Sequence, residues 1–82
     1  MAVAPGPVVR LHRAVAVAEL HGPQAALDDL PDGLEGYYLF HAVKADLLRR
    51  TGRESVARSE YKEAEALTDN ERERAFLRSR RG

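Results

Sequence analysis

The sequence lacks cysteine and tryptophan and has few other aromatic residues. Its 82 residues include only two phenylalanines and three tyrosines. The absence of cysteine excludes disulfides and thiolate metal sites, a composition that fits a reducing compartment. Alanine and leucine must supply most of any core, so the packing must be close. A chain of this length forms one small domain at most, near the lower limit for an independent core.

Charge and hydropathy give no indication of a nucleic-acid or membrane partner. Thirteen basic and thirteen acidic residues cancel, so the whole chain has no net charge to attract phosphate backbones or anionic lipids. No apolar run approaches the roughly 18 residues of a membrane-spanning helix. The opening residues, MAVAP, lack the basic start and apolar stretch of a signal peptide. We therefore expect a cytoplasmic protein.

The stretch from Tyr37 to Leu67 is predicted to form two helices joined at a glycine. On both sides of Gly52, apolar residues recur at three- and four-residue steps, which marks one face of a helix in each half. Gly52 can adopt the positive φ of a helix C-cap and so separates the halves. Such a hairpin cannot bury its apolar face alone. The apolar positions are Phe40, Val43, Leu47 and Leu48 before the glycine, and Val56, Ala57, Tyr61, Ala64 and Leu67 after it.

Prolines and glycines divide the N-terminal third into a linker and two helices. Residues 1–7 are predicted to be a turn or linker, because the two prolines and the glycine of APGP prevent regular hydrogen bonding. A helix is expected over residues 8–20. Gly22 is suited to end it, and Pro23 to begin a short second helix that runs to Leu30.

The C-terminal segment is predicted to form a last helix. Asn70 is a favourable N-cap residue, and Glu73, three residues later, completes a capping-box pattern. We expect this helix to end near Ser79. No strand is expected anywhere, so the predicted fold class is all-α, with four to five antiparallel helices.

An internal repeat relates the predicted helices. The positions of Leu11, Val15, Ala18 and Gly22 recur 30 residues later as His41, Ala45, Leu48 and Gly52, and a third copy would begin near Phe76. Helix-turn-helix units with a period near this value are typical of an α-solenoid, and about 34 residues is the tetratricopeptide value. His41 and Lys44 stand where that pattern has a large apolar pair. We predict one domain over residues 8–82, a short right-handed solenoid of tetratricopeptide-like hairpins, with repeat one over 8–31, repeat two over 37–68 and a partial third repeat or capping helix over 70–80.

Histidines and serines are the candidate catalytic or metal-binding residues. His12, His21 and His41 lack the i,i+4 spacing of a helical zinc site and have no cysteine or carboxylate partner at ligand spacing. Ser55 and Ser59 lie on a helix face that is predicted to be exposed, with no nucleophile motif or glycine-rich phosphate loop nearby. A small hydrolase or metal enzyme is therefore a distant alternative, and we expect no enzymatic activity, metal or cofactor.

Arginines gather at two predicted helix ends and could contact phosphate groups. Glutamates are interspersed among them, and cations at a helix C-terminus are favoured by the helix dipole in any case. We therefore interpret both groups as solvated helix ends and expect no direct nucleic-acid binding. The first group is Arg49, Arg50 and Arg53, and the second is Arg72, Arg74, Arg78, Arg80 and Arg81.

Three segments in combination resemble one protein family. They are APGPVVRLHRAVAVAELHGPQAALDDL, YYLFHAVKADLLRRTGR and NERERAFL, and they extend from Ala4 to about Leu77. The combination resembles the C-terminal, tetratricopeptide-type extension of extracytoplasmic-function sigma-70 factors. The resemblance implies a regulatory domain of a transcription initiation factor that contacts the rest of the factor or RNA polymerase. The core-binding and promoter-binding regions of that family are not in this sequence, so we expect a fragment of such a factor.

The resemblance also implies a groove that binds a partner protein. In tetratricopeptide arrays, residues from the first helix of each hairpin line a concave surface. A mixture of small and charged side chains at these positions suits a docked helix or an extended peptide. Ala16 and Ala42 could equally pack against a neighbouring helix. Carried over by position, the groove residues are Val9, His12, Ala16 and Glu19 in repeat one, and Leu39, Ala42, Asp46 and Arg49 in repeat two.

Two other partner hypotheses remain open at the level of sequence. The chain could be a stand-alone tetratricopeptide-like adaptor that binds a peptide unrelated to transcription, because a fold does not fix a function. The exposed repeat ends near Val8 and Phe76 could also allow self-association. The choice between the sigma-factor domain and the adaptor rests on the resemblance alone.

Overall fold

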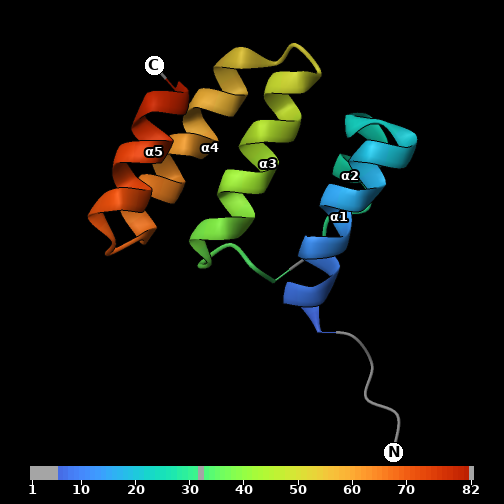
Figure 1. The fold of residues 1–82 in the computed structure, drawn as a ribbon, viewed down its shortest axis with the longest axis horizontal. Helices are drawn as coiled ribbons and strands as arrows, with labels where there is room; N and C mark the ends of the chain where they lie inside the picture. The colour runs from blue at the N-terminus through green and yellow to red at the C-terminus, as the bar shows by residue number, and fades with distance from the viewer. Residues whose placement is uncertain (1–5, 32, 82) are drawn as a thin grey trace, which may run out of the picture.

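Five helices connected by short loops make up the described part of the chain in a computed structural model, which covers residues 6–31 and 33–81 (Figure 1). No strand occurs in these residues, so the predicted all-α class is confirmed. Most of the predicted linker over residues 1–7 lies outside the described residues. The helices are α1 (Pro7–His21), α2 (Pro23–Asp28), α3 (Tyr38–Arg50), α4 (Glu54–Leu67) and α5 (Glu71–Arg81).

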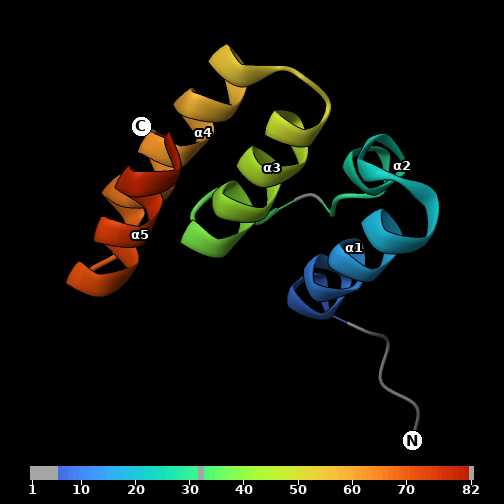
Figure 2. The same ribbon diagram turned by 45° about the horizontal axis from the view of Figure 1, so that its top comes forward.

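Helix α3 lies in the middle of the molecule, between the α1–α2 pair and the α4–α5 pair (Figure 1). The same order is seen in the turned view, where α1, α3 and α5 run in the same general direction (Figure 2). The α3–α4 pair makes the most extensive contact, α5 packs on α4, and α1 reaches α3 mainly through α2. The molecule is a flattened body of 43 × 28 × 18 Å. None of its helices, within the described ranges, is long and apolar enough to cross a membrane.

The short helix α2 ends two residues earlier than predicted. Its start is as expected, because Pro23 occupies the first turn and Gly22, with φ of 92°, donates its backbone N–H to the Ala18 carbonyl at 3.0 Å. At its end, the N–H of Leu30 bonds to the Leu27 carbonyl, three residues back, at 3.3 Å. This tighter i→i+3 bond replaces the α-helical one and turns the chain toward α3. Asp32, in the predicted turn that follows, lies outside the described residues.

Gly52 ends α3 as the sequence predicts. Its φ is 84°, and its N–H bonds to the Arg49 carbonyl at 3.1 Å, while the N–H of Arg53 reaches back to the Leu48 carbonyl at 2.9 Å. These two bonds are the pair that defines a Schellman motif, which satisfies carbonyls left without partners at a helix end. The motif reverses the chain and places α4 against α3.

Small residues dominate the contact between α3 and α4. Ala45, Ala57 and Ala64 are almost completely buried, and the larger Leu48 and Tyr61 fill the space around them. Alanine allows two helix axes to approach closely without a cavity. A second cluster joins the N-terminal helices to α3, and the partly buried Leu27 packs against both clusters. The second cluster consists of Ala14, Ala18, Ala26 and Leu47.

His41 is a buried polar residue, and each of its ring nitrogens has a partner within hydrogen-bond distance. Its Nε2 lies 2.6 Å from the Glu35 carbonyl oxygen and must donate to it, since a carbonyl only accepts. Its Nδ1 lies 3.1 Å from Oε1 of Glu60, which is also 3.7 Å from Nζ of Lys44. The polar pair that departs from the repeat pattern thus ties α3 to α4 and to the preceding loop.

We expect Gly52→Ala to lower the free energy of unfolding by about 1–2 kcal/mol, because an L-residue is strained at positive φ. A Cβ atom at Gly52 would meet nothing within 4 Å, so the effect should come from backbone conformation alone. Gly36→Ala is the matched control, since its Cβ also meets nothing and its φ is not positive. Urea unfolding followed by circular dichroism measures both, and equal destabilisation would contradict this explanation.

Candidate functional site

A mainly apolar groove lies where α1, α3 and α5 face one another. Its central hollow, of about 220 Å³, is lined by residues of these three helices and by Tyr61 of α4. A second hollow, of about 260 Å³, continues it between α3 and α5. The two hollows share Ala42, Phe76 and Leu77, so we treat them as one feature, the α1/α3/α5 groove.

The walls of the groove differ in chemistry. The α1 wall consists of Val15 and Ala18. The α5 wall carries Arg72, Phe76 and Arg80, which are four residues apart and therefore share one helix face. Phe76 is 57% exposed and lines both hollows.

The floor of the groove contains a buried hydroxyl. Tyr61 is 3% exposed, and its hydroxyl has no hydrogen-bond acceptor within residues 6–31 and 33–81. The pKa of Arg49 is raised above its ordinary value. The main cause is its hydrogen bond to Asp46, and the second is its interaction with Tyr61. A guanidinium only donates hydrogen bonds, so the Tyr61 hydroxyl proton still lacks an acceptor.

Carboxylates at the rim of the groove pair with arginines of α3. Asp46 accepts a hydrogen bond from Nη2 of Arg49 at 2.9 Å and contacts Nε of Arg50 at 3.1 Å. Glu19 of α1 lies 3.9 Å from Nη1 of Arg50, so the ion pair spans from α1 to α3. These side chains are largely solvated, and each pair contributes little to stability. Their effect is to neutralise Arg50 at this end of the groove.

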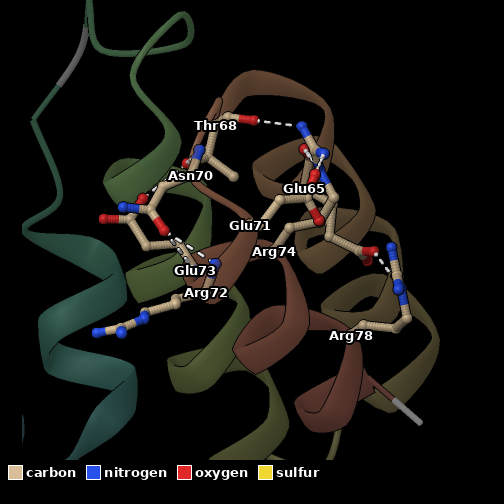
Figure 3. Close-up of polar contacts among 8 residues, drawn as sticks. All are labelled: Glu65, Thr68, Asn70, Glu71, Arg72, Glu73, Arg74 and Arg78. Carbon is tan, nitrogen blue, oxygen red and sulfur yellow. Dashed lines mark hydrogen bonds and ion pairs between the residues drawn. The ribbon is translucent and has the colours of Figure 1, made fainter.

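A network at the α4–α5 corner fixes the α5 wall (Figure 3). Asn70 caps α5 as predicted, since its Oδ1 accepts the backbone N–H groups of Arg72 at 2.9 Å and Glu73 at 3.2 Å. In a capping box, the Glu73 side chain would bond directly to the backbone N–H of Asn70. Here the Thr68 hydroxyl lies between the two groups. This hydroxyl donates to Glu73 at 2.6 Å and accepts from the Asn70 N–H at 3.2 Å.

Arg74 and Arg78 fasten α5 to the end of α4. The Arg74 guanidinium donates to the Thr68 carbonyl at 2.7 Å and pairs with Glu71. Nε of Arg78 lies 3.5 Å from a carboxylate oxygen of Glu65. These two arginines therefore stabilise the packing of α5 against the end of α4. In Figure 3 the Arg72 side chain extends away from this network.

Two of the eight predicted groove residues, Ala42 and Asp46, line the central hollow, and Leu39 lines the second hollow. On α1, the four predicted residues lie on the exposed surface, and Val15 and Ala18 line the hollow. Arg49 is exposed and bonds to Asp46. The four α1 residues are Val9, His12, Ala16 and Glu19.

Sequence reasoning missed the contribution of α5. The sequence predicts a repeat end at Phe76 and a solvated helix end at Arg72 and Arg80. The available signal was their four-residue spacing, which places a lone aromatic between two arginines on one face of a highly charged helix.

The candidate catalytic and metal-binding residues lie apart. His12 and His21 are exposed on α1, whereas His41 is buried against α4. Ser59 donates a weak hydrogen bond to the Ser55 carbonyl at 3.4 Å. In the part of the chain that the structure describes, no three histidine or acidic side chains are grouped so that they could hold a metal ion.

A protein of Rhizobium meliloti (strain 1021) is similar to this chain. The two are 43% identical over 77 residues, which is 90% of this chain and 18% of that protein. That relative is described as uncharacterized, and this chain spans about a fifth of its length. No family model and no solved structure matches the chain.

We expect Asn70→Ala to lower the free energy of unfolding by about 1 kcal/mol, because two backbone N–H groups of α5 lose their acceptor. The neighbouring Asp69→Ala serves as control, since Asp69 is exposed. Thermal unfolding of both variants, followed by circular dichroism, measures the difference. A smaller effect for Asn70→Ala than for Asp69→Ala would contradict the role of the cap.

Stability in alkaline solution should depend on Tyr38. The nearby Glu73 carboxylate, followed by burial, raises the Tyr38 pKa above its ordinary value of 10.0. Tyr38 therefore ionises at a lower pH in the unfolded chain than in the folded protein. The stabilisation that protonated Tyr38 contributes is complete below about pH 10 and is lost as the pH rises through the folded-state pKa. We expect Tyr38→Phe to flatten the decline of the melting temperature above about pH 10. Glu73→Gln should flatten it too and Glu63→Gln, on the exposed side of α4, should not.

Proposed function

We propose that this chain is a non-catalytic protein-interaction domain of a sigma-70-type transcription initiation factor. In this proposal, the α1/α3/α5 groove binds either the rest of the factor or RNA polymerase. The observation that carries the proposal is the groove itself, an apolar surface with an exposed phenylalanine, bounded by charged side chains. Protein-binding sites commonly combine an apolar centre that contains an aromatic residue with a polar rim.

The proposed architecture is a short right-handed solenoid of tetratricopeptide-like hairpins. Helices α1, α3 and α5 begin at residues 7, 38 and 71, so their starts are 31 and 33 residues apart. These intervals are close to the tetratricopeptide repeat of about 34 residues. The common direction of the three helices (Figure 2) and the position of the groove between them support this arrangement.

The assignment to a sigma factor rests on the sequence resemblance. The similarity to about a fifth of a longer Rhizobium protein is consistent with a domain that functions within a larger chain. A cytoplasmic location follows from this assignment. A stand-alone adaptor would use the same groove for a different partner, so identification of the partner decides between the two.

Affinity capture from a bacterial lysate tests the proposal. We expect the chain to retain RNA polymerase subunits or the promoter-binding region of a sigma factor, and Phe76→Ala to reduce this capture at least about tenfold. Val56→Ala is the matched control, because Val56 is 51% exposed on α4 and lies outside the groove. Captured proteins are identified by mass at several salt concentrations, which separates protein contacts from nucleic-acid contacts.

The same capture experiment distinguishes the adaptor hypothesis and tests whether the groove is the binding site. Another reproducible partner that Phe76→Ala releases would replace the sigma-factor assignment with the adaptor. Capture that is unchanged by Phe76→Ala would exclude the groove as the binding site.

A further inference from the structure

We infer that the groove recognises an acidic amphipathic segment of a protein, in which an apolar side chain lies between two carboxylates. The apolar side chain would occupy the surface formed by Ala42, Phe76 and Leu77, and the carboxylates would pair with Arg72 and Arg80. This inference rests on the proposed function, in that it takes the groove as a protein-binding site.

The α5 wall sets the spacing of the two arginines that would bind the carboxylates. Arg72 and Arg80 are eight residues apart on one helix face, which corresponds to about 12 Å along the axis. Phe76 lies midway between them, and the Arg80 guanidinium lies 5.2 Å from the centre of its ring. The two arginines therefore flank Phe76 along the helix, and the Arg80 guanidinium lies close to the Phe76 ring.

The arginines of α5 divide into two groups with different partners. Arg74 and Arg78 bond to the carboxylates of Glu71 and Glu65 at the α4–α5 corner. By contrast, neither Arg72 nor Arg80 has a carboxylate within ion-pair distance among the residues that the structure describes. The groove face thus carries two arginines that form no ion pair within the described fold.

The acidic residues along the groove are already engaged. Asp46 binds Arg49 and Arg50, and Glu73 accepts the Thr68 hydroxyl. Thr68 is neutral, so Glu73 keeps its negative charge beside Arg72, whereas Asp46 near the Arg80 end is paired with two arginines. The net positive charge therefore lies at the Arg80 end, and at the other end Arg72 is a guanidinium without a carboxylate partner. Complementary charge of this kind selects the partner and its orientation more than it adds affinity.

The floor of the groove favours a polypeptide over a nucleic acid. It is formed mainly by alanine, valine, leucine and phenylalanine side chains, which suit an apolar anchor.

Selection from a random library of displayed peptides, about 15 residues long, tests this inference with the whole chain as bait. We expect enrichment of sequences in which a leucine or an aromatic residue lies between acidic residues. Carboxylates about 12 Å apart are seven or eight residues apart in a helix and about four apart in an extended strand. Fluorescence anisotropy then gives the affinity of the enriched peptide.

The double variant Arg72→Glu/Arg80→Glu should weaken binding of the enriched peptide about tenfold, because two attractions become repulsions. The matched control is Arg58→Glu/Lys62→Glu, which reverses two charges on the exposed face of α4, outside the groove. It should leave the affinity unchanged within about twofold. All four positions are exposed, and circular dichroism verifies that both variants fold.

Four results would overturn the inference: no enrichment, enrichment of neutral or basic peptides, equal weakening by the control, and displacement of the peptide by a single-stranded oligonucleotide at equal concentration. Lysate capture separates this failure from failure of the proposed function. Capture of polymerase or sigma-factor regions that depends on Phe76 and is unaffected by the arginine variant would refute the acidic partner alone. Acidic peptides that depend on the arginines, without such capture, would refute the sigma-factor assignment alone.

Discussion

The close approach of α3 and α4 is the constraint on which the other contacts depend. With few large side chains available, the core gains its dispersion contacts by bringing backbones together across alanines, as at Ala45, Ala57 and Ala64. The Schellman turn at Gly52 sets the geometry of this pair. Leu77 of α5 packs on the same cluster from the groove side, so the core of the hairpin also supports the floor of the groove.

Helical periodicity gives the charged helix α5 two separate tasks. Residues two positions apart lie on different faces, so Arg72 and Arg74 differ in environment although they are close in sequence. One face fastens the helix to α4, and the other lines the groove. The composition of such a segment therefore says little about its role until the neighbouring helix is placed.

Much of the fold follows from local sequence signals. The predictions at Gly52 and Asn70 are confirmed because a glycine at positive φ and an asparagine cap act within a few residues of the chain. The groove was less predictable. Ala16 and Ala18 are equally small, but α1 turns the face with Ala18 toward the cluster that it forms with α2 and α3, so Ala18 is buried and Ala16 is exposed. The end of α2 likewise depends on where the chain must turn to reach α3.

The two walls of the groove differ in how firmly they are held. Hydrogen bonds and ion pairs from Thr68, Asn70 and Arg74 tie the α5 wall to α4. The α1 wall touches α3 at few points and is attached mainly through the short α2. A tilt of α1 would widen the groove without altering the spacing of charges along α5. The spacing of charges in the groove therefore depends on the firmly held α5 wall, and its width depends on the weakly attached α1 wall.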